Sequence, residues 1–365
     1  MERLLILNPG STSTKIAVFD GETPLFVENI QHDGHQLAEY DKIADQYEFR
    51  KELVLKVMAN HGVKVGDLSA VVSRGGLLPP LSAGAYEIND DMVWHLRYAP
   101  QNEHASNLGA IIARAIVLEY GGGVLPAYIY DAVTVDEMIP IVQVTGLASI
   151  RRKGIGHNLN MRAACVRYAK EKGKRYDECS LIVVHMGGGI SSGIHHMGRI
   201  IDIINDEEGT FSPERAGGLP NHQLIHMVFD GDYDCNGILK VLKNKGGLMS
   251  HFEVNDVRRV EEMADNGDER AKLVYEAMAL NISKNVGALS AVLCGKAEAI
   301  ILTGGIAHSE KFTEMIRERV SFIAPVVVYP GENEMQSLAL GGLRVLRGEE
   351  RARKFTAARG DAGAQ

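Results

Sequence analysis

The sequence lacks the features that mark membrane proteins and disulfide-stabilised secreted domains. No apolar run approaches the ~18 residues of a membrane-spanning helix. The four cysteines, Cys165, Cys179, Cys235 and Cys294, are widely spaced and form no Cys-x-x-Cys pair, so neither a disulfide framework nor a zinc site is expected. We expect all four to be reduced structural thiols.

An excess of positive charge is also missing. The 365 residues include 39 Lys and Arg against 47 Asp and Glu, which gives a net charge of −8 and a pI near 5.9. A nucleic-acid-binding surface would be basic, so the composition argues against a nucleic-acid partner. The N-terminus enters an apolar strand-like run with no basic region or cleavage site before it. We therefore expect a cytoplasmic protein with no membrane partner.

The residues that are present suit a globular protein. Apolar residues make up 45% of the chain and charged residues 24%. At 365 residues the chain is too long for one typical core, and it suits two domains that each bury their own.

The most informative stretch is residues 4–20, where two apolar runs flank a turn rich in Gly, Ser and Thr. The runs have the length and composition of strands, and Pro9-Gly10 between them cannot continue a helix. Gly10 permits close approach of a ligand, the N–H groups of residues 11–14 can converge on an anion, and Lys15 adds a positive charge. The pattern predicts a β-hairpin with a phosphate-sized turn, with an ordinary polar hairpin as the alternative.

A second copy of this pattern occupies residues 181–194. Residues 4–17 align with it without a gap at a constant offset of 177 positions, so that strand falls on strand and Asn8 falls on His185. Two matched hairpins indicate a duplicated domain. They also make the phosphate interpretation stronger than either turn does alone.

Two candidate ligand residues follow buried strands. Arg74 ends the apolar run 70–72 and precedes two glycines, and Asp131 ends the run 126–130. In open α/β sheets, ligands bind at the carboxyl ends of the strands, and an acid there suits Mg²⁺ or substrate orientation. The alternatives are an ordinary surface Arg and an Asp that caps a helix.

Basic loops supply further candidates. Residues 151–157 form a basic segment that ends in His157, and Arg215 lies in a Gly-rich loop with small neighbours. A free-standing His is usually structural, so His157 could simply begin the helix after it. The pair His195-His196 alternates between strand faces and lacks partners for a metal site.

The spacing of apolar residues predicts most of the remaining elements. The stretch 256–295 is helical with a break near Asn266-Gly267, and the charged tail from Glu349 is expected to fray. The other expected elements are strands over 25–30, 299–303 and 323–329, and helices over 36–60, 105–119, 158–172, 309–319 and 336–347.

The segment NPGSTSTK at 8–15 resembles the first signature of the acetate/butyrate kinase (acetokinase) family, and HMGGGIS at 185–191 resembles the second. The forms NPGSTSTK, VSRGG, NEHASN and SPERAG are closest to the butyrate kinase branch. The family belongs to the acetate and sugar kinase/Hsp70/actin superfamily. The resemblance implies an α/β fold of two duplicated actin-like (ribonuclease H-like) domains, with mixed sheets flanked by helices and an ATP cleft between them.

The resemblance also implies the division of the chain. Domain I would comprise 1–133 plus 336–365, carrying the acyl-substrate side and the first phosphate hairpin. Domain II would comprise 134–335, carrying the second hairpin and an adenosine turn at Gly304-Gly305. A homodimer or higher homo-oligomer is expected.

Site roles follow from the same resemblance. Arg74 would hold the substrate carboxylate, Arg215 and His157 would stabilise the transferring phosphoryl group, and Asp131 and Glu334 would position Mg²⁺. The phosphate cleft would be lined by Asn8, Ser11, Ser13, Lys15, His185, Gly187, Gly188 and Gly189, the adenosine site by Gly304 and Gly305, and the acyl site by Gly76, His104 and Gly156.

The implied reaction is transfer of the γ-phosphoryl group between ATP and a short-chain fatty acid, butanoate, by direct in-line transfer. Branched acids (isobutyrate, isovalerate), acetate and propionate are the alternative substrates. Two anions must meet, and like charges ~4 Å apart repel by about 4 kcal/mol at an effective dielectric near 20, so cations are needed. A carboxylate with a pKa of about 4 is already ionised at pH 7 and needs no strong base.

Butanoate is favoured because glycines stand at Gly76 and Gly156, where acetate kinases commonly carry bulkier apolar residues. The missing side chains would leave room for methylenes, each of which contributes about 0.8 kcal/mol when buried. Four-carbon acids, with branched four- or five-carbon acids as a further candidate, would then be preferred over acetate by about ten-fold or more in kcat/KM. Alternatively, both glycines serve only backbone turns.

Other classes fit the sequence less well. A non-enzymatic ATP sensor of the Hsp70 or actin type shares the fold but would need neither Arg74 nor Arg215. A sugar kinase would use an aspartate base against a neutral hydroxyl. A Rossmann oxidoreductase disagrees with the sequence because neither Gly-rich turn has GxGxxG spacing leading into a helix.

Overall fold

The computed structural model describes residues 2–98, 103–231 and 233–356. It divides into two compact units, which are described separately here: unit 1 is Met1–Asp136 with Asn333–Gln365, and unit 2 is Glu137–Glu332. These boundaries differ by three residues from the expected divisions after residues 133 and 335. The tail 357–365 and Asn102 of the NEHASN segment lie outside the described residues.

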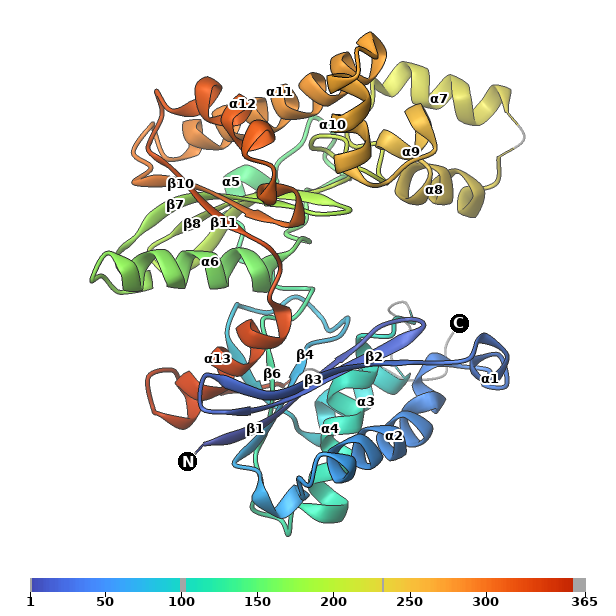
Figure 1. Cartoon of the computed structure of the whole chain (residues 1–365), viewed down its shortest axis with the longest axis vertical. Helices are drawn as coiled ribbons and strands as arrows, with labels where there is room; N and C mark the ends of the chain where they lie inside the picture. Colours follow the sequence, from blue (N-terminus) through green and yellow to red (C-terminus); the bar gives the residue numbers. More distant parts are fainter. Residues whose placement is uncertain (1, 99–102, 232, 357–365) are drawn as a thin grey trace. The chain divides into compact units, whose positions relative to one another are not determined.

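Unit 1 contains a seven-stranded mixed sheet in the order β12-β5-β6-β4-β1-β2-β3 (Figure 1). The predicted first hairpin is confirmed, with β1 antiparallel to β2 and β2 antiparallel to β3. Strand β4 runs parallel to β1, and β6 runs parallel to β4. The strands are β1 (Arg3–Pro9), β2 (Ser13–Asp20), β3 (Thr23–Gln31), β4 (Ala70–Arg74), β5 (Ala85–Glu87), β6 (Ala127–Tyr130) and β12 (Arg353–Lys354).

Helices cover both faces of this sheet. Successive strand residues point to opposite sides, and apolar residues on both faces of β1 are buried. Leu5 and Leu7 of β1 belong to a core with Val54 and Ile112 of α2 and α4. On the other face, Gly342 of α13 packs close to Leu4 and Val72. The helical segments are α1 (Gly34–Leu37), η1 (Ile43–Gln46), α2 (Tyr47–Asn60), η2 (Val65–Asp67), α3 (Asp90–Tyr98), α4 (Asn107–Tyr120) and α13 (Glu334–Leu346).

The single helix expected over 36–60 is wrong. Lys42 is extended (φ −126°, ψ 144°), which separates α1 from the 3₁₀ turn η1 and from α2. The apolar residues Ile43 and Tyr47 still pack against the core. The spacing of these apolar residues therefore predicted correctly that they contact the core, but it did not require one continuous helix.

Unit 2 repeats the same strand arrangement with five strands in the order β11-β10-β7-β8-β9 (Figure 1). Three antiparallel strands are followed by two parallel ones, so β7, β8, β9, β10 and β11 correspond to β1, β2, β3, β4 and β6. The duplication predicted from the two hairpins is present. The strands are β7 (Ser180–Met186), β8 (Ile190–His196), β9 (Arg199–Ile204), β10 (Ala299–Gly304) and β11 (Val326–Pro330).

Two cores pack on the two faces of this second sheet. One joins Ile182 and Leu302 to α10, α11 and α12, and the other joins Val183 and Ile301 to α6. Figure 1 shows α6 and the pair α11–α12 on opposite sides of these strands. The helical segments are α5 (Pro140–Gln143), α6 (Asn158–Glu171), η3 (Tyr176–Glu178), α7 (Asn221–Asp230), α8 (Cys235–Asn244), α9 (Gly247–Phe252), α10 (Val257–Asp265), α11 (Glu269–Val292), η4 (Gly305–His308) and α12 (Glu310–Val320).

The sequence predicted neither disulfides between the cysteines nor a membrane-spanning helix. The four cysteines are all free, with Cys165 and Cys179 buried and Cys235 and Cys294 exposed. No helix in the described part of the chain is both long and apolar enough to cross a bilayer.

Candidate functional site

In unit 1, Arg74, Glu334 and Asn8 come together. Arg74 Nη1 lies 2.9 Å from Glu334 Oε1, and Asn8 Nδ2 donates to Glu334 Oε2 at 2.5 Å. The parallel register pairs Leu7 with Ser73, which brings Asn8 and Arg74 to the same edge of the sheet, and Glu334 is the first residue of α13. We call these three residues the unit 1 cluster.

The first turn contributes the other phosphate candidates of unit 1. Gly10 N–H donates to Ser13 O at 2.7 Å and closes the turn between β1 and β2. Ser11 lies exposed in the turn, and Ser13 and Lys15 lie on β2, with Lys15 directly opposite Asn8. The hairpin thus presents Asn8, Ser11, Ser13 and Lys15 on one short segment.

Asp131 follows β6 in a left-handed conformation (φ +43°) and is buried. Its Oδ1 accepts a hydrogen bond from Gly84 N–H at 2.7 Å. Within residues 2–98, 103–231 and 233–356, no three His, Cys, Asp or Glu side chains form a group that could hold a metal ion. Mg²⁺ is usually held by one or two carboxylates together with substrate phosphates and water, so the metal role expected of Asp131 and Glu334 stays a prediction.

His104 is a neutral hydrogen-bonding residue. Its Nδ1 lies 2.7 Å from Ser106 Oγ and accepts from Ser106 N–H at 3.1 Å, which leaves the proton on Nε2. Burial, and secondarily the nearby charge of Arg74, lowers the pKa of His104. The side chain can therefore donate one hydrogen bond from Nε2 close to Arg74.

The expected room beside Gly76 is absent. A Cβ atom there would lie 2.5 Å from Asn107 Oδ1, 2.7 Å from Asn107 Cα and 2.8 Å from Leu96 Cδ2, so α4 occupies that space. A Cβ atom at Gly156 would lie closer than van der Waals distance to the end of the Ile203 side chain and 3.2 Å from Ser191 Oγ. The argument that two missing side chains enlarge an acyl pocket is therefore wrong at Gly76. At Gly156 it depends on movement of Ile203.

In unit 2, the second turn is surrounded by charged side chains. A Cβ at Gly187 would lie 2.5 Å from Glu332 Oε1, and one at Gly189 would lie 2.7 Å from Arg215 Cζ. The Arg215 loop is also bonded to this turn, since Ser212 Oγ donates to Gly188 O at 2.7 Å. Glycines at these positions let a guanidinium and a carboxylate approach the turn backbone.

Two histidines stack beside this turn. The rings of His157 and His185 are 4.3 Å apart with planes at 24°, and His157 Nδ1 lies 3.0 Å from Ser191 Oγ. His185 Nε2 lies 3.1 Å from Glu332 Oε1, and its buried Nδ1 has no partner among the described residues. We call His157, His185, Ser191, Arg215 and Glu332 the unit 2 cluster.

Arg215 is also paired with an acid. Its Nη1 lies 2.9 Å from Asp206 Oδ2, and its backbone N–H donates to Ser212 Oγ at 3.2 Å. Sequence reasoning missed Asp206 and Glu332 as partners. The local signal for Glu332 was its position just after the apolar run that forms β11.

The predicted adenosine turn follows β10. Gly304 has φ +94°, and a Cβ there would overlap the Met186 backbone, so only glycine fits where β10 passes β7. Nothing lies within 4 Å of a Cβ position at Gly305, which begins η4. Gly304 is therefore explained by packing, whereas Gly305 borders open space.

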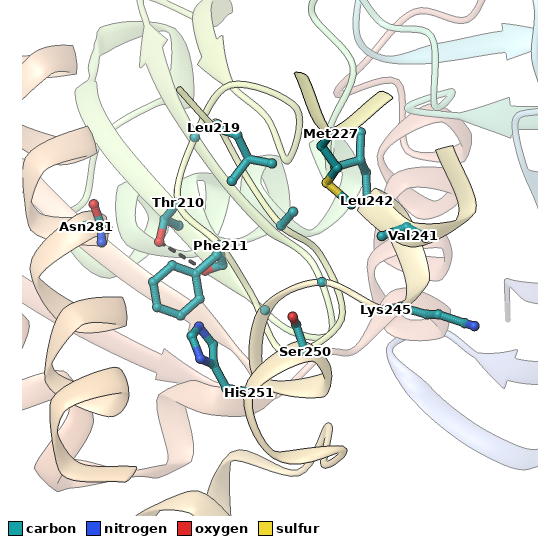
Figure 2. Close-up of a pocket in the computed structure, with 15 residues that line it drawn as sticks. Thr210, Phe211, Leu219, Met227, Val241, Leu242, Lys245, Ser250, His251 and Asn281 are labelled. Atoms are coloured by element: carbon teal, nitrogen blue, oxygen red, sulfur yellow. Dashed lines mark hydrogen bonds between the residues drawn. The ribbon is translucent and has the colours of Figure 1, made fainter. Parts of the chain in front are cut away.

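A cavity of about 340 Å³ lies next to the Arg215 loop (Figure 2). Ala216 lines it, but the catalytic and binding residues expected from the sequence do not. Figure 2 shows Thr210 bonded to the backbone oxygen of Phe211, with both apolar and polar side chains around the cavity. Its labelled side chains are Thr210, Phe211, Leu219, Met227, Val241, Leu242, Lys245, Ser250, His251 and Asn281.

The duplicated mixed sheets with a glycine turn in each unit define a protein of the actin-like kinase fold. The fold matches an acetate kinase from Porphyromonas gingivalis (TM-score 0.77, 20% identity, 95% of this chain and 100% of that chain). It also matches a propionate kinase from Francisella tularensis subsp. tularensis SCHU S4 (0.73, 19%, 93% and 99%) and an acetate kinase from Entamoeba histolytica (0.73, 15%, 94% and 99%).

The family follows from the sequence match. The acetokinase family model matches residues 140–329, just over half of the chain. The chain belongs to the acetokinase family, which implies an ATP-dependent phosphotransferase whose acceptor is a carboxyl group.

Proposed function

We propose that the chain transfers the γ-phosphoryl group between ATP and a short-chain fatty acid, with butanoate + ATP = butanoyl phosphate + ADP as the reaction. The observation that carries this proposal is the position of Arg215, whose guanidinium lies against Gly189 of the second glycine turn. A cation at a phosphate-sized turn offsets the charge that develops during phosphoryl transfer. Family membership supports the same reaction class.

In the proposed reaction, Arg74 binds the carboxylate of the acid, and unit 1 is the acyl side. The planar guanidinium suits a carboxylate because two N–H groups can meet its two oxygens. In the structure, the guanidinium of Arg74 forms an ion pair with Glu334. Mg²⁺ would engage Glu334 and Asp131 and balance the charge of the ATP phosphates, which would release Arg74 for the substrate.

Unit 2 is the proposed nucleotide side. The turn 187–189 receives phosphates, Gly305 borders the adenosine, and Arg215 and His157 stabilise the transferring group. The bond between the γ-phosphorus and the bridging oxygen of ADP breaks as a carboxylate oxygen bonds to phosphorus, and no proton is moved. The acid is already ionised at pH 7, so the reaction requires no general base.

Butanoate is proposed on the forms of the segments NPGSTSTK, VSRGG, NEHASN and SPERAG, not on pocket size. Branched four- and five-carbon acids, acetate and propionate are the competing substrates. A hydroxamate assay with ATP, Mg²⁺ and acids of two to five carbons tests the choice, because hydroxylamine traps an acyl phosphate. We expect kcat/KM for butanoate to exceed that for acetate by about ten-fold.

The outcomes of this assay separate the alternatives. Acetate used as well as butanoate would reject the substrate but keep the carboxylate kinase. ATP binding with no hydroxamate from any acid would instead favour a non-enzymatic ATP sensor.

We also propose that the protein acts in the cytoplasm as a homodimer or higher homo-oligomer. Support comes from apolar side chains exposed on α7 and α8, including Phe229, which is 83% exposed, with Ile225 and Leu239. Light scattering after gel filtration should give about twice the chain mass of 39.8 kDa or more. A monomer mass would contradict this proposal.

A further inference from the structure

Arg50 is a buried cation beneath the first turn. It lies on α2 and is only 1% exposed. Its Nη1 donates to Gly10 O at 2.8 Å and Ser13 O at 3.1 Å, and its Nη2 donates to Ser11 O at 3.0 Å. Further contacts go to Thr14 Oγ1 and Gln46 Oε1. One guanidinium thus gathers three backbone carbonyls of the turn.

The remaining carbonyl of the turn is also satisfied from the protein. Thr12 O accepts from His32 N–H at 2.9 Å. The peptide bonds are trans, so the N–H that follows each carbonyl points the opposite way. The N–H groups of Ser11 and Thr12 are therefore directed away from Arg50, and neither has a protein acceptor among the described residues. The turn presents amide donors because its carbonyl oxygens are held on the other side.

The charge of Arg50 is not balanced by the chain. No carboxylate within the described residues forms an ion pair with it, and its Nε has no partner there. The nearby His32, whose Nε2 lies 2.8 Å from Thr14 Oγ1, has its pKa lowered to about 4 by burial and by Arg50, so it is neutral at pH 7. Burial also lowers the pKa of Arg50 itself to about 10, which still leaves it charged at pH 7.

The carbonyl oxygens of the second turn accept from neutral donors instead, although charged side chains lie nearby. Gly188 O accepts from Ser212 Oγ and from Glu214 N–H, and Gly189 O accepts from Gly187 N–H. A buried charge without a partner is costly unless something compensates it. Arg50 therefore supplies more than the hydrogen bonds that a turn of this size requires.

We propose that Arg50 is the positioning residue of the first phosphate turn: it orients the N–H groups of Ser11 and Thr12 toward a nucleotide phosphate, and its buried charge is balanced by that phosphate. This inference rests on the proposed kinase function, and on the expectation from the family resemblance that the first turn, with Asn8, Ser11, Ser13 and Lys15, lines the phosphate cleft together with the turn 187–189. Arg50 does not touch the phosphate in this scheme. It acts through the turn backbone and through its electric field.

The test compares Arg50→Met and Arg50→Lys with Lys51→Met. Lys51 is the matched control because it is the next residue of α2 and equally buried, yet its ammonium pairs with Glu48 and Glu119. Calorimetry on the full chain would give dissociation constants for ADP and for adenosine, which lacks phosphates. Steady-state kinetics would give KM for ATP and for the acid.

We expect Arg50→Met to weaken ADP binding by about ten-fold or more and to leave adenosine binding within about two-fold, because only phosphates sense the turn and the charge. KM should rise for ATP and not for the acid. Arg50→Lys keeps the charge but loses the planar, forked guanidinium. Its ADP affinity should therefore lie between those of the wild type and Arg50→Met. Lys51→Met should lower thermal stability without changing the ADP to adenosine ratio.

An unchanged ADP dissociation constant in folded Arg50→Met overturns the proposal, as does an equal loss for ADP and adenosine. If Arg50→Met does not fold, Arg50→Lys decides: wild-type ADP affinity in that variant rejects the role. A wild-type chain that binds ADP yet forms no hydroxamate from any acid rejects only the kinase function. If the wild type is an active kinase and the Arg50 variants bind ADP as tightly as the wild type does, only the Arg50 inference is rejected.

Discussion

At the scale of single residues, each candidate arginine is paired with an acid. Arg74 pairs with Glu334 and Arg215 pairs with Asp206, while Arg50 has no carboxylate partner among the described residues. Both pairs are half-buried, and a single ion pair that water can still reach contributes little to stability, so we propose that these arginines serve ligand binding more than folding. Their substitution should therefore affect activity more than stability.

We expect Arg74→Ala and Arg215→Ala each to lower kcat/KM by at least ~100-fold, which corresponds to about 2.7 kcal/mol of lost transition-state stabilisation. Lysine should restore only part of this loss, since it presents a point charge in place of a fork. Steady-state kinetics checks the result, with Arg114→Ala, which removes an arginine paired with Asp90, as the control. Near-normal activity in either variant would remove that arginine from the site.

A buried histidine should make the fold sensitive to acid. His195 is fully buried beside Tyr176, and burial, with a smaller effect of Arg162, lowers its pKa to about 3. Below pH 6.5 the unfolded chain takes up a proton that the folded chain does not. Stability should therefore fall from pH 6.5 toward pH 3 through this group, by at most about 1.4 kcal/mol per pH unit.

Urea unfolding between pH 5 and 7 measures this dependence. His195→Gln should flatten the slope relative to the wild type, whereas substitution of the exposed His222 should not. Equal slopes for the wild type and His195→Gln would mean that the histidine titrates normally.

At the scale of elements, Gly76 shows how a packing contact can look like a pocket in the sequence. Asn107 Cα of α4 stands where the side chain would begin, and this backbone atom cannot move without the helix. Gly76→Val should lower the free energy of unfolding by about 1–3 kcal/mol through overpacking. The ratio of butanoate to acetate activity should not change, since no occupied acyl space is altered.

Urea unfolding and acid competition assays check this expectation. Gly66→Ala is the matched control, because nothing lies within 4 Å of its Cβ position. A Gly76→Val protein as stable as the wild type, with a shifted preference toward acetate, would restore the pocket interpretation.

The sequence predicted the elements whose local signals agree with their packing. Both hairpins combine apolar runs with turn residues, and the break between α10 and α11 falls at Gly267 as expected. Helices α3, α7, α8 and α9 were not predicted. Helix α7 has no buried residue, so packing against a core does not account for it.

The site was predictable as a set of residues but not as a set of contacts. Arg74 and Glu334 were identified separately, yet they are 260 positions apart, and only the folded sheet brings them together. Glu332 was missed for the same reason, because it is far from His185 in the sequence. Asp206 is close to Arg215 in the sequence, but nothing in the irregular loop between them predicted the ion pair. Arg50 was not identified from the sequence, because the sequence does not distinguish a buried arginine on a helix from an exposed one.

At the scale of the whole molecule, the two units differ in how they are encoded. Unit 2 is one continuous segment, Glu137–Glu332, while unit 1 is completed by Asn333–Gln365. Deleting residues 333–365 should leave unit 2 folded and expose the sheet face of unit 1 that α13 covers. Hydrogen exchange should then show lost protection in β1 and β4 and retained protection in β7 and β10. Unchanged exchange in β1 would contradict this expectation.

The position of α13 in the chain has a consequence for synthesis on the ribosome. Gly341 and Gly342 of α13 fit tightly against Tyr130, Val72 and Leu4. Because translation proceeds from the N-terminus, the strands of unit 1 leave the exit tunnel first but wait with one apolar face uncovered while all of unit 2 is made. Unit 2 can fold as soon as its last strand emerges. The nascent chain should therefore need chaperone protection for unit 1 in particular, although unit 1 is synthesised first.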